Sequence, residues 1–416
     1  MDRISGLCDE LLIKILLYVP TKVAVSTSIL SKRWEYLWMW LPKLDYDSRY
    51  DSPSECKRLG CFLDKNLPLH RAPVIESFRL NFSSSKLKPE SIKMWVVIAV
   101  SHCLRELEII YDSYTEKPNI LPSNLYTCKS LVILKLKGDI LLDVPRVAFL
   151  PSLKTMHLRS VRYLNVEESL HRLLSNCPVL DDLLVDLCEY DTMGKLTVVV
   201  PSLLSLSLYI PDYYDIDGIV IDTPSLKYFK LRDHNIKSHY CLVENMPNLI
   251  EADLDVELPY IKSVVRSITS VKRLAKCSEA MYGQGFVFNQ LVHLEICMCK
   301  EHSSDLLVPL LRDSSSLQVL DLILIDYHEE ISEMEYWNQP STVPECVLSR
   351  LQTLDWSVYR GTPGERDLAV YILKNVVHFK TMKITSCEMD VQRQFEMIKE
   401  LALSSRASTT CQLVFD

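Results

Sequence analysis

Cysteine and histidine are the residues of this chain that offer the chemistry of nucleophiles and metal ligands. The 416 residues include 14 cysteines and 10 histidines. The cysteines lack Cys-x-x-Cys pairs and the histidine spacing of zinc sites, which predicts reduced thiols and no metal. We interpret the close pair in Cys297-Met-Cys299 as two ordinary thiols. A Cys–His nucleophile assembled from distant segments stays an open alternative, because such residues need not be adjacent in sequence.

Glycine-rich and acid–base motifs of enzymes are missing from the sequence. Gly283-Gln-Gly285 lacks the third glycine of a dinucleotide-binding loop, and with 9 glycines in all there is no phosphate-binding Walker loop. The zinc-protease motif His-Glu-x-x-His and the nucleophile motif Gly-x-Ser-x-Gly are absent. The histidines are dispersed, so we expect each to be a surface or repeat residue. We therefore expect a non-catalytic protein with no cofactor.

The overall charge and hydropathy of the chain limit the classes of partner and the cellular compartments that we expect for it. Its formal net charge is −8 and its pI is about 5.8 without a basic run, which argues against nucleic acid or an anionic membrane as a partner. The longest apolar run, Trp95 to Val100, is far shorter than the roughly eighteen residues of a membrane span. The N-terminus is acidic and amphipathic, unlike a signal peptide. Together with reduced thiols, this predicts a nuclear or cytoplasmic protein.

Two apolar stripes at helical spacing lie in the N-terminal 45 residues. The first runs from Leu11 to Val19 and ends at Pro20, because proline blocks helix continuation. The second runs from Trp34 to Leu41, and a shorter helix is expected between the two. A segment this short cannot bury these side chains alone. Periodicity leaves open whether the stripes pack on the chain's own next segment or dock on a partner.

An apolar-x-x-apolar-x-apolar pattern recurs between residues 75 and 322. The first apolar residues of successive repeats lie 20 to 29 residues apart, as in leucine-rich repeats. The last two apolar residues of each repeat point inward from one short parallel strand, and the residues between them face outward. One repeat cannot bury its leucines, whereas stacked repeats form a continuous core and a concave binding face. We predict an irregular solenoid, because some repeats have room for a helix and others do not.

The outward positions of the repeats are the candidate substrate-binding residues. They are mainly basic in the earlier repeats and acidic in the later ones, with Tyr209 as an aromatic anchor. The candidates are Lys135, Lys137, His157, Arg159, Tyr209, Lys230, Arg232, Asp253 and Asp255. Our hypothesis is a face of graded charge that selects a target of opposite polarity. The alternative is that these side chains are merely solvated.

A new pattern begins after the acidic segment from Asp326 to Glu335. It reads as strand, helix, strand, helix and strand over 351–358, 365–376, 381–385, 390–404 and 411–415. Gly361-Thr-Pro-Gly364 predicts a turn before the first of these helices. The strands can extend the sheet of the repeats and cover its exposed end.

The N-terminal segment resembles a plant-type F-box in Ile4 to Leu16, Leu17 to Lys22 and Ser28 to Trp38. The resemblance implies a three-helix platform that docks on a Skp-family adaptor, which links it to a cullin and a RING subunit. By motif match, the adaptor-binding residues are Leu7, Leu11, Leu12, Ile15, Leu16, Pro20 and Trp34. The family usually has proline where this chain has Cys8, and the loss of that proline is expected to weaken the ordering of the first helix.

The rest of the chain resembles plant F-box proteins with degenerate leucine-rich repeats and a C-terminal FBD domain. The segments that carry this resemblance are Leu173 to Leu180 and Val343 to Ile384. It implies an α/β chain with an F-box at 1–45, a connector at 46–74, a leucine-rich-repeat solenoid at 75–325 and an FBD cap at 340–416. The implied function is substrate recognition in an SCF ubiquitin ligase. The alternatives are an adaptor-binding scaffold without ubiquitylation and a small-molecule co-receptor.

Overall fold

A computed structural model describes residues 4, 6–48, 52–83, 88–112, 119–164, 166–188, 192–235, 237, 239–244, 246–256, 261–277, 286–299, 303–324, 334–386 and 390–416. The chain divides into two compact units, Met1–Thr223 and Pro224–Asp416. The Gly283-Gln-Gly285 motif and most of the acidic segment 326–335 lie outside the described residues.

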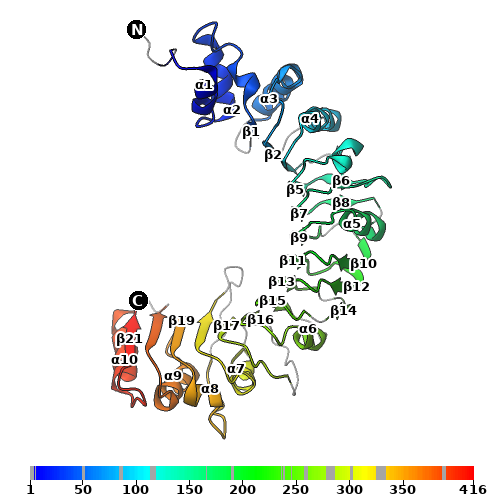
Figure 1. Cartoon of the computed structure of the whole chain (residues 1–416). Coiled ribbons are helices and arrows are strands. Elements are labelled where there is room, and N and C mark those ends of the chain that lie inside the picture. Colours follow the sequence, from blue (N-terminus) through cyan, green and yellow to red (C-terminus); the bar gives the residue numbers. More distant parts are fainter. Residues whose placement is uncertain are drawn as a thin grey trace. The chain divides into compact units, whose positions relative to one another are not determined.

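Short helices occupy the N-terminal part of the first unit (Figure 1). They are α1 (Asp9–Leu16), α2 (Thr21–Ser26) and the 3₁₀ helices η1 (Thr27–Ile29) and η2 (Leu37–Trp40). Pro20 immediately precedes α2, where its fixed φ suits a helix start. The predicted third helix is shorter than its apolar stripe, with one 3₁₀ segment after a series of turns. The stripe nevertheless marks a buried face, because Trp34, Leu37, Trp38 and Leu41 are all buried.

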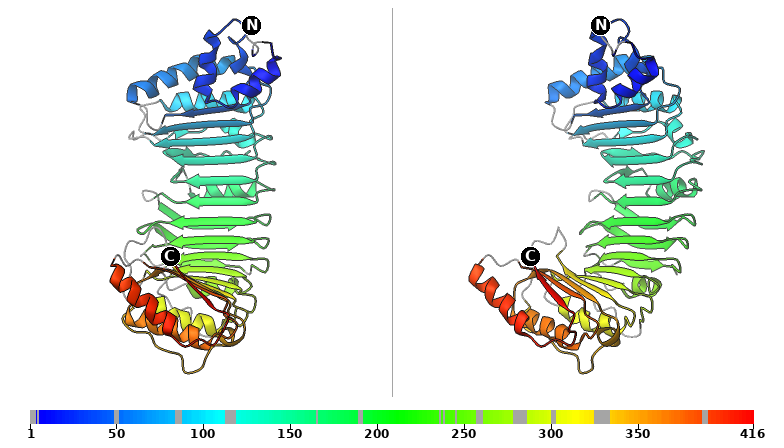
Figure 2. Two further views of the ribbon diagram at one scale, coloured as in Figure 1. Left: turned by 90° about the vertical axis from the view of Figure 1, so that its left-hand side faces the viewer. Right: turned by 60° about the vertical axis from the view of Figure 1, so that its left-hand side comes forward.

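A parallel sheet forms the core of the first unit, in the order β1-β2-β3-β5-β7-β9-β11. Figure 2 shows these strands side by side. Their bounds are β1 Lys43–Asp47, β2 Ser77–Ser83, β3 Glu106–Asp112, β5 Ile133–Gly138, β7 Thr155–Arg159, β9 Asp182–Asp186 and β11 Ser205–Ile210. Each predicted repeat of this unit therefore contributes one strand, whereas β1 lies before the first predicted repeat at residue 75.

The strands alternate between buried and accessible side chains. On β5, Leu134 and Leu136 are buried, Lys135 is half-buried and Lys137 is exposed. Partner residues follow the same alternation, since Leu134 lies opposite Leu107 and Met156, which are also buried. The register thus stacks the inward leucines of successive repeats into one core.

Helices connect some of these strands and shorter segments connect others. The helical elements are α3 (Pro53–Asn66), η3 (Leu67–Leu69), α4 (Pro89–Ser101), η4 (Ser123–Thr127) and α5 (Val166–Ser175). The remaining connections contain β4 (Asn119–Ile120), β6 (Ile140–Leu142), β8 (Arg162–Tyr163), β10 (Thr192–Val199) and β12 (Asp215–Asp222). These short strands pair in parallel as β4-β6-β8 and β10-β12. The predicted irregularity of the repeats is therefore a change from helix to strand in the connections.

The connecting helices are tied down by capping and by side-chain contacts. Ser52 and Glu55 form a capping box at the start of α3, in which each side chain meets the other's backbone N–H. Trp95 of α4 is fully buried and its indole Nε1–H donates to Asp64 Oδ1 of α3 at 2.9 Å. Helix α3 therefore packs beside α4 and is more than a loose connector.

The strands of the second unit are also parallel and follow the order β13-β15-β16-β17-β18-β19-β20-β21. The strands are β13 Tyr228–Asp233, β15 Glu251–Val256, β16 Arg273–Cys277, β17 His293–Cys297, β18 Val319–Ile323, β19 Thr353–Tyr359, β20 Thr381–Ser386 and β21 Gln412–Phe415. A further short strand, β14, spans Tyr240–Val243. The helices are α6 Ile261–Ser267, α7 Ser303–Arg312, α8 Glu345–Ser349, α9 Pro363–Asn375 and α10 Val391–Leu403.

The C-terminal strands and helices follow the predicted order. β19 pairs with β18 of the last repeat, and β20 and β21 extend the same sheet. Helix α9 begins at a capping box formed by Thr362 and Glu365, and Gly361 just before it has a φ of 72°, which glycine adopts without strain. The C-terminal module therefore continues the core of the repeats.

Within the parts of the chain that the structure describes, none of the helices has the length and apolar character needed to cross a membrane.

We predict that Cys8→Pro stabilises α1. Cys8 precedes the helix with a φ of −69°, close to the value that proline imposes, so the substitution needs no backbone change. It is expected to add about 0.4–1 kcal/mol by restricting the unfolded chain. Hydrogen exchange of the Leu11 and Leu12 amides, which donate to the Cys8 carbonyl, should slow roughly twofold to fivefold.

Cys8→Ala is the control, because it removes the thiol without restricting φ. Equal exchange rates in Cys8→Pro and Cys8→Ala would contradict the prediction.

Candidate binding surfaces

The predicted adaptor-binding residues divide into accessible and buried groups. Leu11 and Ile15, one turn apart on α1, are 45% and 41% exposed. Pro20 is exposed and Leu7 is half-buried. By contrast, Leu12, Leu16 and Trp34 are buried inside the first unit. The accessible group is available to a partner, whereas the buried group supports the fold that presents it.

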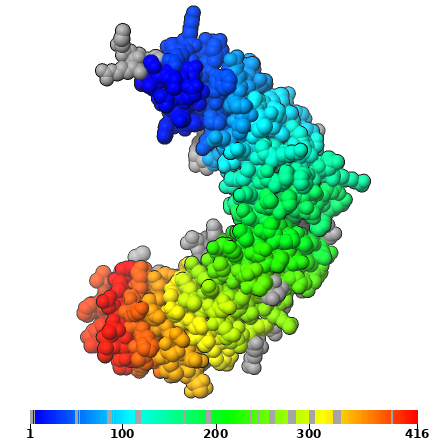
Figure 3. Space-filling view, viewed as in Figure 1, coloured from blue at the N-terminus to red at the C-terminus, as the bar shows by residue number. Residues whose placement is uncertain are grey.

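Further apolar side chains in this segment are more exposed than Leu11 and Ile15. Tyr18 is 89% exposed, Ile29 86% and Leu30 66%. We call Leu11, Ile15, Tyr18, Ile29 and Leu30 the N-terminal apolar surface. Ile29 and Leu30 were not among the predicted adaptor-binding residues. They follow Ser28 in the segment that resembles the F-box, so the motif could have identified them. Space-filling Figure 3 shows this N-terminal segment in blue.

An ion pair holds the two halves of the N-terminal segment together. Arg33 Nη2 lies 2.9 Å from Asp9 Oδ1 in the first turn of α1, and the same guanidinium donates to the Leu7 carbonyl oxygen. The segment that follows Leu30 is thus anchored at the start of α1. Because both groups are partly exposed, the pair serves to position the segment and contributes little to stability.

The predicted basic residues of the first unit come together on two neighbouring strands. Lys135 lies opposite His157, and Lys137 opposite Arg159, in the register of β5 and β7. All four line a surface hollow of about 290 Å³ that also includes Glu108. Lys137 and Arg159 are exposed, and Lys135 and His157 are half-buried. We call Lys135, Lys137, His157 and Arg159 the basic block.

Tyr209 is two strands from the block. It lies opposite Asp186, which in turn lies opposite Arg159, so the register sets Asp186 between Tyr209 and the block. Tyr209 is half-buried in β11. It is therefore on the same row of the sheet as Arg159 without lining the hollow.

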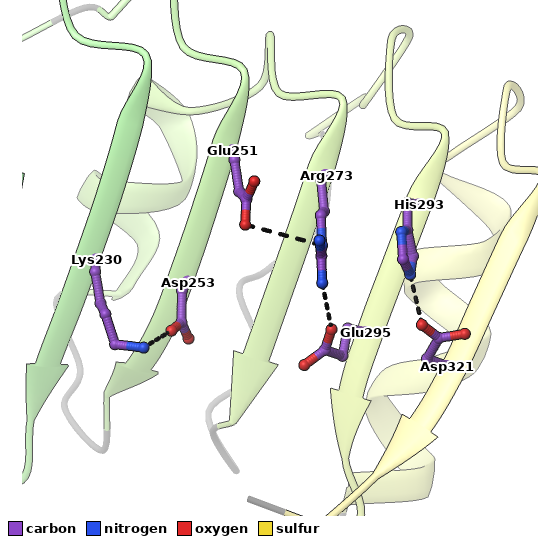
Figure 4. Close-up of polar contacts among 7 residues, drawn as sticks. All are labelled: Lys230, Glu251, Asp253, Arg273, His293, Glu295 and Asp321. Atoms are coloured by element: carbon purple, nitrogen blue, oxygen red, sulfur yellow. Dashed lines mark hydrogen bonds and ion pairs between the residues drawn. The ribbon is translucent and has the colours of Figure 1, made fainter. Parts of the chain in front are cut away.

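Charged residues of the second unit, including the predicted Lys230 and Asp253, pair across neighbouring strands (Figure 4). Lys230 forms an ion pair with Asp253 on the next strand. Arg273 lies 3.1 Å from Glu295 and 3.9 Å from Glu251, on the strands to either side. Lys230 and Arg273 thus neutralise neighbouring carboxylates of this face, those of Asp253, Glu251 and Glu295.

Arg232 and Asp255 occupy the next outward row. They lie opposite each other in the register of β13 and β15. Asp255 is buried, and its Oδ2 lies 2.9 Å from His234 Nε2. Asp255 therefore contributes to packing between strands and is not accessible to a target.

Four histidines lie against aspartates, which sequence spacing did not reveal. His157 pairs with Asp182, His234 with Asp255, His239 with Asp233 and His293 with Asp321. In three of the pairs the two residues come from adjacent repeats, so that only stacking brings them together. The hydrogen bond from His157 holds the pKa of Asp182 below its ordinary value, against the effect of burial.

The fully buried Asp233–His239 pair is the arrangement closest to a catalytic dyad. His239 Nε2 lies 2.9 Å from Asp233 Oδ2, and both side chains are inaccessible to solvent. The nearby Cys241 is also buried, and this burial, with the charge of Asp233, raises the pKa of its thiol to about 12. A thiol that stays protonated and inaccessible is a poor nucleophile. We therefore interpret the Asp233–His239 pair as a structural contact in the connection between β13 and β14.

His293, Glu295 and Asp321 place metal-ligating atoms within 4.8 Å of one another. Figure 4 shows them on neighbouring strands beside Arg273. Glu295 is already paired with the guanidinium of Arg273, which neutralises part of the cluster. We interpret the cluster as an ion-pair network.

Cys297 and Cys299 are buried and form a small apolar cluster with Leu324. Strand alternation after the buried Ile296 would turn Cys297 outward, but Cys297 is only 2% exposed. The two thiols are therefore packing residues, consistent with their interpretation as ordinary thiols.

We predict that the stabilising effect of His239 decreases as the pH rises. Burial by itself lowers the pKa of His239, but the hydrogen bond and charge of Asp233 outweigh it and leave the pKa above its ordinary value. A raised pKa means that the charged form stabilises the fold below about pH 6.5 and that this stabilisation is lost as the pH rises through the folded-state pKa. The difference in thermal midpoint between the wild type and His239→Gln should shrink over that range.

His378→Gln removes an exposed imidazole and is the control for this measurement. A midpoint difference for His239→Gln that grows or stays constant with pH would contradict the assignment.

Family models match three parts of the chain. The F-box domain model matches residues 4–46, and the FBD model matches residues 339–384. A model described as "FBD-associated F-box protein At5g56370, LRR repeats" matches residues 92–249. An F-box in general implies binding to a Skp-family adaptor, and repeat-containing F-box proteins generally act as non-catalytic substrate adaptors.

Curated proteins of Arabidopsis thaliana resemble the chain over its full length. FBD-associated F-box protein At4g10400 is 59% identical over 416 residues, which cover 100% of both chains. FBD-associated F-box protein At5g38590 is 53% identical over 96% of this chain and 98% of its own. Putative F-box/FBD/LRR-repeat protein At5g62970 is 44% identical over 100% of both. The chain therefore belongs to the plant family of FBD-associated F-box proteins with leucine-rich repeats.

Proposed function

We propose that this chain is the substrate-recognition subunit of an SCF-type ubiquitin ligase. Residues 1–45 dock on a Skp-family adaptor and through it reach the cullin and the RING subunit. Residues 75–325 bind a target protein, and residues 340–416 close the end of the repeat sheet. The observation that carries the proposal is the N-terminal apolar surface. Its apolar side chains lie in the F-box segment and remain exposed to solvent, as expected for side chains that bind a partner.

The contribution of this chain in that complex is proximity. A target held near a ubiquitin-loaded conjugating enzyme meets it at high effective concentration, so the recognition subunit needs no catalytic group of its own. The accessible outward residues of the repeat strands support target binding, because they offer polar and charged groups on a rigid sheet.

We predict that Leu11→Asp/Ile15→Asp abolishes adaptor binding without unfolding the chain. Both side chains are more than two-fifths exposed, so the free protein tolerates the carboxylates. In the complex, each substitution removes apolar contact and buries a charge, and affinity should fall by roughly a hundredfold or more. Co-purification with a Skp-family adaptor and cullin measures the loss.

Val147→Asp/Leu164→Asp is the matched control, since both residues are exposed apolar side chains outside the N-terminal segment. Leu16→Asp serves a different purpose: Leu16 is buried, so this change should unfold α1 as well as prevent binding. Failure of the wild-type chain to bind the adaptor would refute the proposal.

Ubiquitylation separates the ligase subunit from the scaffold alternative. A complex reconstituted with the wild-type chain should ubiquitylate proteins that the chain captures, and Leu11→Asp/Ile15→Asp should capture them without ubiquitylation. Adaptor binding with no ubiquitylation of any captured protein would identify the chain as a scaffold.

A further inference from the structure

Within the described chain, Lys135, Lys137 and Arg159 of the basic block differ from Arg79, Lys230 and Arg273 because they have no ion-pair partner. Arg79 lies 3.4 Å from Glu108, Lys230 pairs with Asp253, and Arg273 lies 3.1 Å from Glu295. Among the residues that the structure describes, no hydrogen bond or ion pair involves the side chain of Lys135, Lys137 or Arg159.

Three acidic residues lie around the block, and two of them are engaged with other partners. Glu108 lines the hollow but is paired with Arg79, and Asp182 is bonded to His157. Asp186 lies opposite Arg159 in the register, but no ion pair joins the two side chains. Glu108 lies opposite Lys135 in the register, but within the described chain none of these carboxylates forms an ion pair with Lys135, Lys137 or Arg159.

This arrangement carries an electrostatic cost in the free protein. Like charges at directly opposite positions of neighbouring strands repel one another, and Lys137 and Arg159 are such a pair. An anionic ligand in the hollow would remove that repulsion and gain attraction from each cation.

The spacing of the block matches an extended polypeptide. Lys135 and Lys137 are alternate residues of one strand, so their positions differ by about 6.4–6.8 Å, the distance between alternate side chains of an extended peptide. The row formed by His157 and Arg159 repeats that spacing about 4.8 Å away on the next strand.

We infer that the basic block binds an acidic segment of the target protein, in an extended conformation with carboxylate side chains at alternate positions. One carboxylate lies near Lys135, and the next lies near Lys137 and Arg159. The guanidinium of Arg159 provides the bidentate geometry that a carboxylate prefers. This inference rests on the proposed function, because it names the chemistry of the target.

A fluorescein-labelled peptide of alternating glutamate and glycine tests the inference by fluorescence anisotropy with the full chain. The same peptide with glutamine in place of glutamate should not bind. Lys135→Gln/Lys137→Gln should weaken binding of the glutamate peptide by about tenfold, as expected for two partly exposed charge pairs, and added salt should weaken it further.

Lys129→Gln/Lys154→Gln is the matched control. It removes the same charge from the turns before β5 and β7, where both lysines are exposed and outside the hollow. Neutral substitution at exposed positions leaves the core intact, and unchanged thermal midpoints of both variants will establish that they fold.

Equal binding of the glutamine peptide, absence of glutamate-peptide binding, or equal weakening by the two lysine variants would overturn the inference. The peptide experiment does not require the adaptor. A chain that binds adaptor but ignores the glutamate peptide refutes this inference alone, and a chain that binds the peptide but no adaptor refutes the proposed function alone.

Discussion

The burial of two apolar side chains per strand is the constraint on which both units of this chain depend. A single strand such as β5 cannot cover Leu134 and Leu136, and their burial comes from the neighbouring strands and from the segments behind them. Parallel pairing places equivalent leucines of successive repeats opposite each other. The same pairing leaves the residue between them, Lys135, on the accessible face. Core and candidate binding face are thus two consequences of one alternation.

Stacking also decides which charges are neutralised. A cation on one strand lies opposite the residue that the next repeat has at the same register position. Lys230 therefore lies opposite Asp253, whereas Lys137 lies opposite Arg159. Paired positions contribute local order and little stability, because they are partly exposed. The unpaired positions of the basic block retain electrostatic attraction for a ligand. Local pairing is therefore a better guide to a binding site here than the total charge of a repeat.

The N-terminal segment also uses leucine and isoleucine side chains, but it buries some of them and leaves others accessible. Helix α1 buries Leu12 and Leu16 against the first unit and leaves Leu11 and Ile15 accessible. The buried side chains hold the helix in place, and the accessible ones remain for a partner. This division explains why an F-box motif contains more apolar residues than any one interface requires, and it separates variants that test binding from variants that test folding.

The sequence by itself determined the repeat architecture, the strand–helix order of the C-terminal module and the identity of the N-terminal motif. Leucine spacing is a local property, and the inward and outward positions around Leu134 and Leu136 follow from strand alternation alone. Tertiary structure decided that α1 divides its apolar stripe, that only Leu37–Trp40 of the stripe from Trp34 to Leu41 forms a 3₁₀ helix, and that Cys297 is covered. It also decided that His293 meets Asp321 and that Lys137 meets no acid within ion-pair distance in the described chain. These outcomes depend on which residue of the next repeat arrives at each register position, and sequence periodicity does not contain that information.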